Sequence, residues 1–215
     1  DKKVKRTKQR PIASGKITVL NAWVYVALLC LVALVILLQF NWLTIVLGLS
    51  SMFLAFSYPF VKRITYWPQL FLGLTFNWGI IMGWTSITNS ISIEPIILYF
   101  AAIFWTLGYD TIYGLQDMRD DEIIGIKSTS IKFKNNIKIF VTTCYSLCVL
   151  IILIMFLMME INKYLLLLSI PFIISLVYQI KIFKIDNPKS CLAAFKNNNL
   201  SGLLIFIFIF SFNIL

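Results

Sequence analysis

Residues 19–40 read VLNAWVYVALLCLVALVILLQF, and this stretch decides the fold class. It has no charged side chain and, as a helix rising about 1.5 Å per residue, it can cross the roughly 30 Å hydrocarbon core of a bilayer. Further apolar windows of similar kind lie at residues 42–60, 68–87, 94–114, 137–159, 163–182 and 199–215. The sequence therefore predicts an all-α polytopic membrane protein with seven transmembrane helices.

The composition of the whole chain supports this fold class. Hydrophobic residues make up 60% of the chain, charged residues only 13%, and the mean hydropathy is +0.87, which leaves too little polar surface for a soluble domain. A membrane β-barrel would need segments of about ten residues that alternate apolar and polar. The run VLIILIMFLMM at residues 149–159 does not alternate. Because the linkers are short, we expect a single transmembrane domain over residues 1–215.

The basic residues predict how the bundle is oriented. Eighteen of the 19 Lys and Arg residues lie before the first window or in every second linker. By the positive-inside rule, these segments face the cytoplasm or the mitochondrial matrix. Residues 1–18 then form a basic cytoplasmic segment. This segment either binds polyphosphate as a flap that faces the acidic loop across the same mouth, or only orients the chain and attracts anionic lipid. The net charge of +10 is explained by topology, and we expect no nucleic-acid partner.

Residues 108–136 form an acidic loop in this apolar chain. Five of the nine carboxylates lie here: Asp110, Asp117, Asp120, Asp121 and Glu122. If the preceding helix continues, one face carries Asp110, Tyr113, Asp117 and Asp121, and Asp117 lies one turn from Asp121. Two carboxylates this close repel each other unless a cation lies nearby, and hard oxygen ligands suit Mg²⁺. The alternative is a solvated loop, although an unpaired Asp110 near the end of an apolar helix would be costly.

Other metal chemistry is poorly supported. The chain has no histidine, which excludes histidine-ligated metals and histidine acid–base catalysis. Its four cysteines lie in or beside apolar windows without a metal-ligand spacing.

Four segments in order carry a resemblance to a known family: KRTKQRPIASG (5–15), SYPFVKRITYWPQLFLGLTFNWGI (57–80), YDTIYGLQDMRDDEIIGIKSTSI (109–131) and CLAAFKNNNLSGL (191–203). The chain resembles the UbiA superfamily of intramembrane prenyltransferases, most closely the branch that prenylates 4-hydroxybenzoate. This resemblance implies a nine-helix bundle with two aspartate motifs at its mouth. Asp117 and Asp121 match the second motif, and Asp1 matches the end of the first. We therefore expect a piece that lacks about two N-terminal helices.

The resemblance also implies the site and the reaction. Mg²⁺ ions held by Asp1, Asp117 and Asp121 would bind the diphosphate of a polyprenyl diphosphate and favour its ionisation. The ring carbon ortho to the hydroxyl of 4-hydroxybenzoate would then attack, as in ubiquinone biosynthesis. The implied catalytic residues are Asp117, Asp121 and Arg63; the candidate diphosphate partners are Lys5, Arg10, Lys62, Arg63 and Lys127; and the residues for the acceptor or for shielding the cation are Tyr58, Tyr109 and Asp110, with Trp67 and Trp78 as further aromatic candidates.

Several alternatives stay open at this point. A relative of the same superfamily could use a naphthoate, homogentisate, haem or chlorophyll precursor as acceptor, and the chain could be an inactive remnant. A secondary transporter would also be polytopic, but its ionisable groups usually lie near the bilayer midplane between similar halves. Membrane lipid is a partner in each case, and the membrane is a bacterial or mitochondrial inner membrane.

Overall fold

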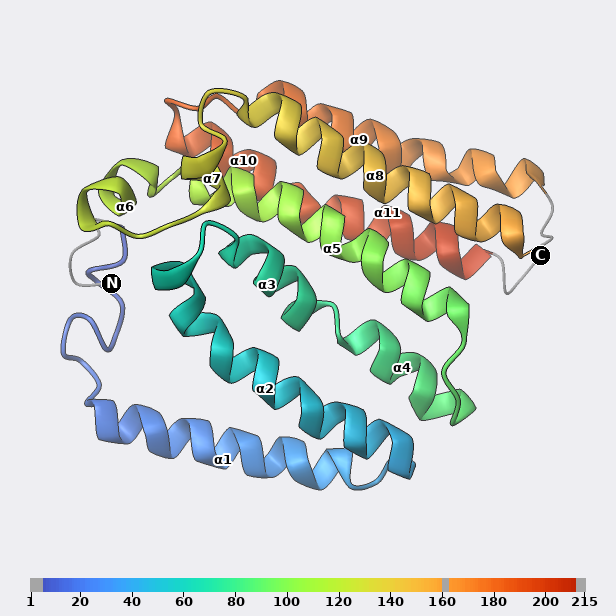
Figure 1. The fold of residues 1–215 in the computed structure, drawn as a ribbon, viewed down its shortest axis with the longest axis horizontal. Helices are drawn as coiled ribbons and strands as arrows, with labels where there is room; N and C mark the ends of the chain where they lie inside the picture. Colours follow the sequence, from blue (N-terminus) through green and yellow to red (C-terminus); the bar gives the residue numbers. More distant parts are fainter. Residues whose placement is uncertain (1–5, 160–162, 212–215) are drawn as a thin grey trace.

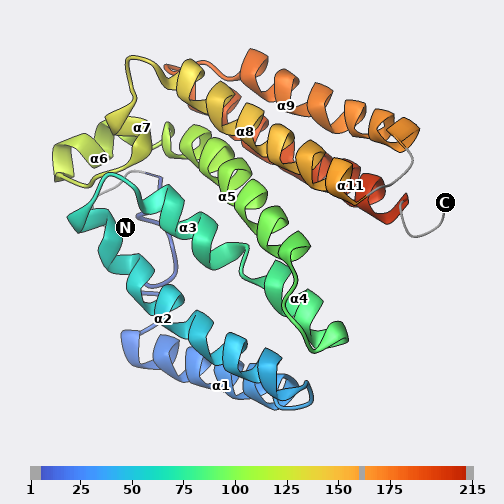
Figure 2. The same cartoon turned by 45° about the vertical axis from the view of Figure 1, so that its right-hand side comes forward.

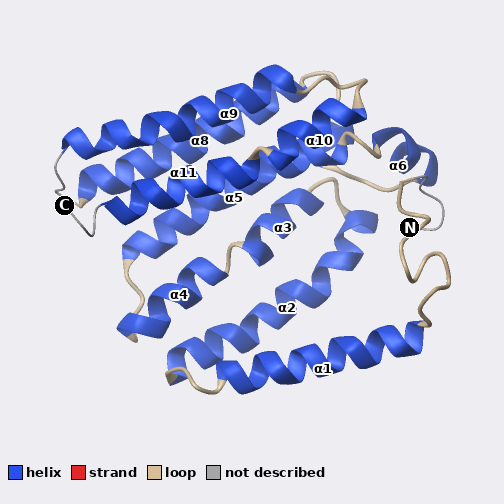
Figure 3. Cartoon of the chain, turned by 180° about the vertical axis from the view of Figure 1, so that it is seen from behind, coloured by secondary structure: helices blue, strands red, loops and turns tan. Residues whose placement is uncertain are grey.

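The computed structural model describes residues 6–159 and 163–211, and these residues are helices joined by loops and turns (Figure 3). The helices, in chain order, are α1 (Val19–Leu37), α2 (Trp42–Ile64), α3 (Pro68–Phe76), α4 (Gly79–Thr88), α5 (Ile93–Gly114), α6 (Met118–Ile124), α7 (Thr129–Lys132), α8 (Ile137–Met158), the 3-10 helix η1 (Lys163–Ser169), α9 (Ile170–Ile182), α10 (Pro188–Lys196) and α11 (Asn198–Ser211).

Seven segments of the described chain are long and apolar enough to cross a membrane. They are α1, α2, α3 with α4, α5, α8, most of η1 with α9, and α10 with α11. The predicted fold class, an all-α polytopic membrane protein, is therefore confirmed, and the chain is a multi-pass integral membrane protein.

Helix α5 lies in the middle of the bundle (Figures 1 and 2). Helices α2, α3 and α4 lie on one side of it, α8, α9 and α11 lie on the other, and α1 is outermost beyond α2. The larger core cluster joins α5 to α8, α9 and α11 through side chains such as Ile112, Val141, Phe172 and Phe208. Because α5 is central, side chains at its end can reach elements from both sides.

One end of the bundle collects the segments that carry most of the basic residues. The N-terminal segment, the end of α2, helices α6 and α7, and the start of α10 all lie there (Figure 1). This arrangement is the one the distribution of Lys and Arg predicts, because each of these segments belongs to the same set of linkers. Which compartment this end faces stays a prediction.

The third span is broken, whereas the sequence predicts one helix over residues 68–87. Helix α3 ends at Phe76 and α4 begins at Gly79. The side-chain amide of Asn77 donates to the carbonyl of Gly73 (2.9 Å) and to Oγ1 of Thr106 on α5 (2.8 Å). Trp78 Nε1 donates to the carbonyl of Leu47 on α2 (2.9 Å). These bonds tie the break to both neighbouring helices.

The last span begins earlier than predicted. The apolar window begins at residue 199, but the span begins with α10 at Pro188 and continues through α11. Asn187 caps α10, since its Oδ1 accepts from the backbone N–H groups of Lys189 and Ser190. Asn197 alone separates α10 from α11. Because α10 carries polar residues on one face, its hydropathy is too low for the sequence to show that it belongs to the span.

The fourth predicted span, residues 94–114, is confirmed as α5, and this helix does not continue to Asp117. Helix α5 ends at Gly114, and α6 begins only at Met118. Gly114 packs closely against α7, because a Cβ there would lie 2.5 Å from Oγ of Ser130. The chain turns after this point, Asp117 precedes a separate short helix, α6, and Asp120, Asp121 and Glu122 lie on it.

Candidate active site

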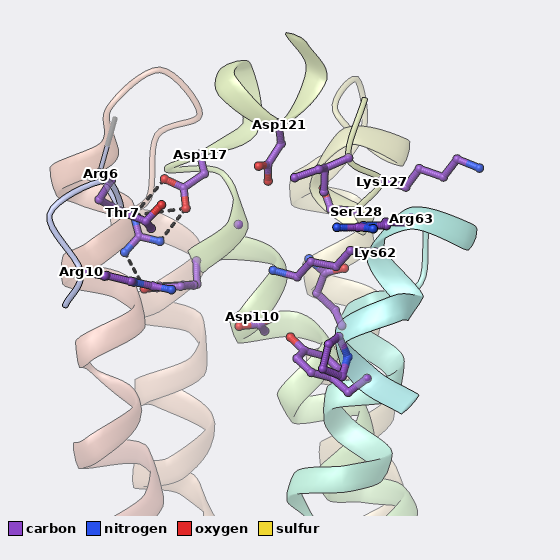
Figure 4. A pocket seen from close by; sticks show the side chains of 16 residues that line it. Arg6, Thr7, Arg10, Lys62, Arg63, Asp110, Asp117, Asp121, Lys127 and Ser128 are labelled. Carbon is purple, nitrogen blue, oxygen red and sulfur yellow. Dashed lines mark hydrogen bonds and ion pairs between the residues drawn. The ribbon is translucent and has the colours of Figure 1, made fainter. Parts of the chain in front are cut away.

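A pocket of about 310 Å³ opens at the end of the bundle where the basic segments gather (Figure 4). It lies between the N-terminal segment, the end of α2, the end of α5, and the α6–α7 region. Its lining residues are Arg6, Thr7, Arg10, Tyr58, Pro59, Lys62, Arg63, Gln69, Asp110, Tyr113, Gly114, Asp117, Asp121, Ile126, Lys127 and Ser128. Carboxylates and cations from distant parts of the chain therefore share one cavity.

The predicted aspartate pair lies at the start of α6. Asp117 is the residue before this helix, and the backbone N–H of Asp121 donates to the carbonyl of Asp117 (2.8 Å). The two residues are thus one helical turn apart, as the spacing predicts, although on α6 rather than on α5. Burial raises the pKa of Asp121, and Lys62 acts in the opposite direction. Both side chains project toward the pocket (Figure 4).

Arg6 holds Asp117 in a forked contact. Its Nε lies 2.9 and 3.2 Å from the two carboxylate oxygens, and a second guanidinium nitrogen also donates to Asp117. The remaining guanidinium nitrogen donates to the hydroxyl of Tyr113 (2.8 Å), and the group lies 5.0 Å from the Tyr113 ring centroid. The hydrogen bonds with Asp117 raise the pKa of Arg6 further above its usual value. Asp117 is therefore neutralised by a residue of the N-terminal segment.

The end of α2 supplies two cations to the opposite wall. Lys62 projects into the space between Asp110 and Asp121, while Arg63 lies near Ser128 (Figure 4). Arg10 lines the pocket from the N-terminal segment. This distribution places positive charge on two sides of the carboxylates, which is the electrostatic pattern expected for binding a polyanion.

The loop after α6 is anchored to the bundle by buried polar contacts. Oε1 of Gln69 accepts from the backbone N–H of Thr129 (3.0 Å), and Oγ of Ser130 donates to the carbonyl of Thr111 (2.7 Å). Lys127 lines the pocket, but its ammonium donates to the carbonyl of Ile64 at the end of α2 (3.1 Å). Its side chain points away from the carboxylates (Figure 4).

Three of the predicted aromatic residues do not line this pocket. Tyr109 packs against Trp105 and Phe195, on the side of α5 that faces α9–α11. Trp67 packs against Phe133 and Phe140, and Trp78 packs against Tyr99 within the second core cluster. Tyr58 is the candidate of this group that lines the pocket. Two other predicted site residues, Asp1 and Lys5, lie outside the described residues.

The sequence places Tyr113 on the same helical face as Asp117, but it does not predict that Arg6 contacts both side chains. Seven basic residues precede the first span, and composition does not distinguish Arg6 from its neighbours. No local spacing relates Arg6 to a residue 111 positions further along the chain.

The donor set fits a Mg²⁺ ion that is shared with a substrate. Within the described residues, no group of three or more His, Cys, Asp or Glu side chains forms a metal cage. Mg²⁺ characteristically binds through one or two carboxylates, and completes its shell with water and substrate phosphate. Asp117 and Asp121 supply hard oxygen ligands of this kind. The cations around them would repel a bare metal ion but would attract its complex with a diphosphate.

The fold and the pocket define a multi-pass membrane protein with a carboxylate pair facing cations at one end of its helical bundle. The family model of the UbiA prenyltransferase family matches residues 1–211, and the chain belongs to this family. It is 41% identical, over 96% of its length, to a mitochondrial 4-hydroxybenzoate polyprenyltransferase from Aedes aegypti, of which it covers 47%. It is 40% identical to the Bos taurus protein of the same name, over 96% of this chain and 56% of that protein. The chain thus spans about half the length of the curated relatives it matches.

A solved structure has the same fold. The apo structure of a UbiA homologue from Aeropyrum pernix K1 superposes with a TM-score of 0.81, over 98% of this chain and 78% of that one, at 19% sequence identity. At this identity, the likeness concerns the fold alone. It confirms that the arrangement of helices around α5 is the arrangement of a UbiA-type bundle.

Proposed function

We propose that this chain carries out, within its native protein, the transfer of a polyprenyl group from polyprenyl diphosphate to the ring carbon ortho to the hydroxyl of 4-hydroxybenzoate. The names of the two relatives above support this substrate pair, and family membership supports prenyl transfer in general. The proposed place in metabolism is ubiquinone biosynthesis.

The observation that carries the proposal is the composition of the pocket. The pair Asp117 and Asp121 lies in the same cavity as the cations Arg10, Lys62 and Arg63, at the end of a membrane-spanning bundle. A diphosphate head group needs both kinds of side chain, because its charge is neutralised by cations and by a metal ion held on carboxylates. Its polyprenyl tail needs the apolar environment that a membrane supplies. A cavity of this kind at a bundle end matches an amphiphilic substrate.

Asp117 and Asp121 would hold Mg²⁺, which, when bound, would withdraw charge from the diphosphate and make it a better leaving group. Lys62 and Arg63 bind the diphosphate oxygens from the side of α2. The planar fork of Arg63 also suits the carboxylate of the acceptor. Tyr58, on the same helix, supplies an aromatic surface beside the reacting carbon.

The test replaces the two aspartates one at a time in the native protein. We expect Asp117→Asn and Asp121→Asn to lower kcat/KM for prenyl transfer by ~10²–10³, because each removes a group that neutralises developing charge. Activity is measured in membranes with radiolabelled prenyl diphosphate across a series of Mg²⁺ concentrations. The matched control is Asp186→Asn, which removes an exposed carboxylate outside the pocket. Full turnover in both aspartate variants would contradict the metal assignment.

The acceptor is tested separately with a panel of aromatic acids in the same membranes. We expect label to enter 4-hydroxybenzoate. Labelling of a naphthoate acceptor in its place would keep the prenyltransferase assignment but overturn the proposed acceptor.

A further inference from the structure

Asp110 is a third carboxylate in the pocket, and the metal site does not use it. It lies on α5, seven residues before Asp117 and four residues before this helix ends at Gly114. Figure 4 shows it deeper in the cavity than Asp117 and Asp121. Both the pocket lining and the helix position therefore place its carboxylate on the membrane side of the proposed diphosphate site.

The contacts of the Asp110 carboxylate give it no structural role. Within the described part of the chain, no side chain or backbone group forms a hydrogen bond or ion pair with its carboxylate, and Lys62 of α2 projects into the space beside it (Figure 4). A carboxylate near the end of a membrane span is costly when it lacks such partners. By contrast, the Asp117 carboxylate is held by Arg6. A free, inward-facing carboxylate is available for chemistry.

The proposed reaction needs a proton acceptor at this depth. The prenyl carbon that reacts is bonded to the diphosphate, so the acceptor ring must lie just below the metal site, toward the membrane. The chain contains no histidine. Among the described lining residues, the other side chains are the two proposed metal ligands, cations, phenols and neutral groups. Asp110 is the remaining carboxylate, and carboxylates are common general bases.

We propose that Asp110 is the catalytic base that removes the ring proton, an inference that rests on the proposed function. The diphosphate leaves with the electron pair of the C–O bond, and the ring carbon ortho to the hydroxyl forms the new C–C bond. That carbon then carries both the prenyl group and a hydrogen. Asp110 takes the proton, the C–H electron pair restores the aromatic ring, and the proton leaves from Asp110 to solvent through the pocket mouth.

The experiment compares the native protein with its Asp110→Asn variant, using 4-hydroxybenzoate that is either unlabelled or deuterated at both positions ortho to the hydroxyl. With Asp110 present, proton loss follows C–C bond formation rapidly, so the two acceptors should react at equal rates. In Asp110→Asn, we expect kcat to fall by ~10²–10⁴, the usual contribution of a general base, and a normal primary isotope effect to appear. Asp186→Asn should leave both quantities unchanged.

A second measurement separates this inference from the proposed function. Prenyl diphosphate labelled with ¹⁸O in the bridging position is incubated with an acceptor analogue whose ortho positions are blocked, and movement of the label to non-bridging positions reports ionisation. We expect Asp110→Asn to retain this exchange and Asp117→Asn to lose it. Loss of exchange in Asp110→Asn would assign Asp110 to binding or structure. Retained exchange without an isotope effect would assign the proton to another base, such as the diphosphate. Both results overturn the inference, and neither affects the metal assignment.

Discussion

Helices α1 and α5 are both apolar enough to cross a membrane, but they differ in what they contact. None of the 19 residues of α1, all of them in the described part of the chain, is buried, and Leu20 and Leu29 are 73% and 70% exposed. Nine residues of α5 are buried, among them Thr106, Gly108 and Thr111. In a bilayer, apolar side chains gain little by leaving lipid, so helices associate through small and polar residues. The helix with small and polar residues is therefore the central one, and the more uniformly apolar helix lies at the edge.

Gly108 gives the strongest test of this comparison, because α8 packs directly on it. A Cβ at this position would overlap the ring of Tyr145. We expect Gly108→Ala to destabilise the protein by about 1–3 kcal/mol, the usual cost of overpacking a close contact. The control is Gly83→Ala in α4, where the added Cβ would meet nothing within 4 Å beyond the neighbouring backbone of its own helix. Thermal unfolding in detergent measures both variants, and equal midpoints would show that α5 does not depend on this contact.

A pair of large-to-small changes compares the two helices directly. Ile112 on α5 is fully buried, whereas Leu29 on α1 is 70% exposed. We expect Ile112→Ala to cost about 2 kcal/mol, mostly from the cavity left behind, because transfer of the side chain from lipid contributes little. Leu29→Ala should stay within about 0.5 kcal/mol of the native protein. The same unfolding assay checks both variants. A large loss in Leu29→Ala would indicate that another surface covers α1 in the membrane.

The smallest effect concerns the segment before α1, which reaches the end of α5 through Arg6. Because the guanidinium occupies the Asp117 carboxylate, Arg6→Gln should tighten Mg²⁺ binding to the substrate-free protein by about two- to fivefold, as expected for a partly exposed ion pair. Titration with Mn²⁺, followed by electron paramagnetic resonance, measures this affinity without turnover. Lys8→Gln removes an equal charge from the same segment outside the pocket and should have less effect. Weaker metal binding in Arg6→Gln would mean that Arg6 supports the metal site rather than competing with it.

The sequence predicts features that depend on neighbouring residues, but not those that depend on contacts between helices. The length of an apolar segment predicts a span because the thickness of the bilayer sets the length that a span must have. The one-turn separation of Asp117 and Asp121 is also predictable, because a single helical turn depends only on neighbouring residues. The break at Asn77 and the end of α5 at Gly114 depend on partners in other helices, namely Thr106 and Ser130. In the same way, Oδ1 of Asn198 accepts from Nε2 of Gln179 between helices α9 and α11 (3.1 Å). Such contacts between helices cannot be predicted from the local pattern of the sequence.

The contact between Arg6 and Asp117 joins residues 111 positions apart, and four candidate spans lie between them. During synthesis, Arg6 emerges well before Asp117, and their contact can form only after the fourth of these spans, α5, has been made. The loop that the contact closes is long, so forming it is slow compared with packing one helix onto the next. The mouth of the pocket therefore closes only after the first four of the seven candidate spans of the described chain have been made, and protease protection of the N-terminal segment would report when it has closed.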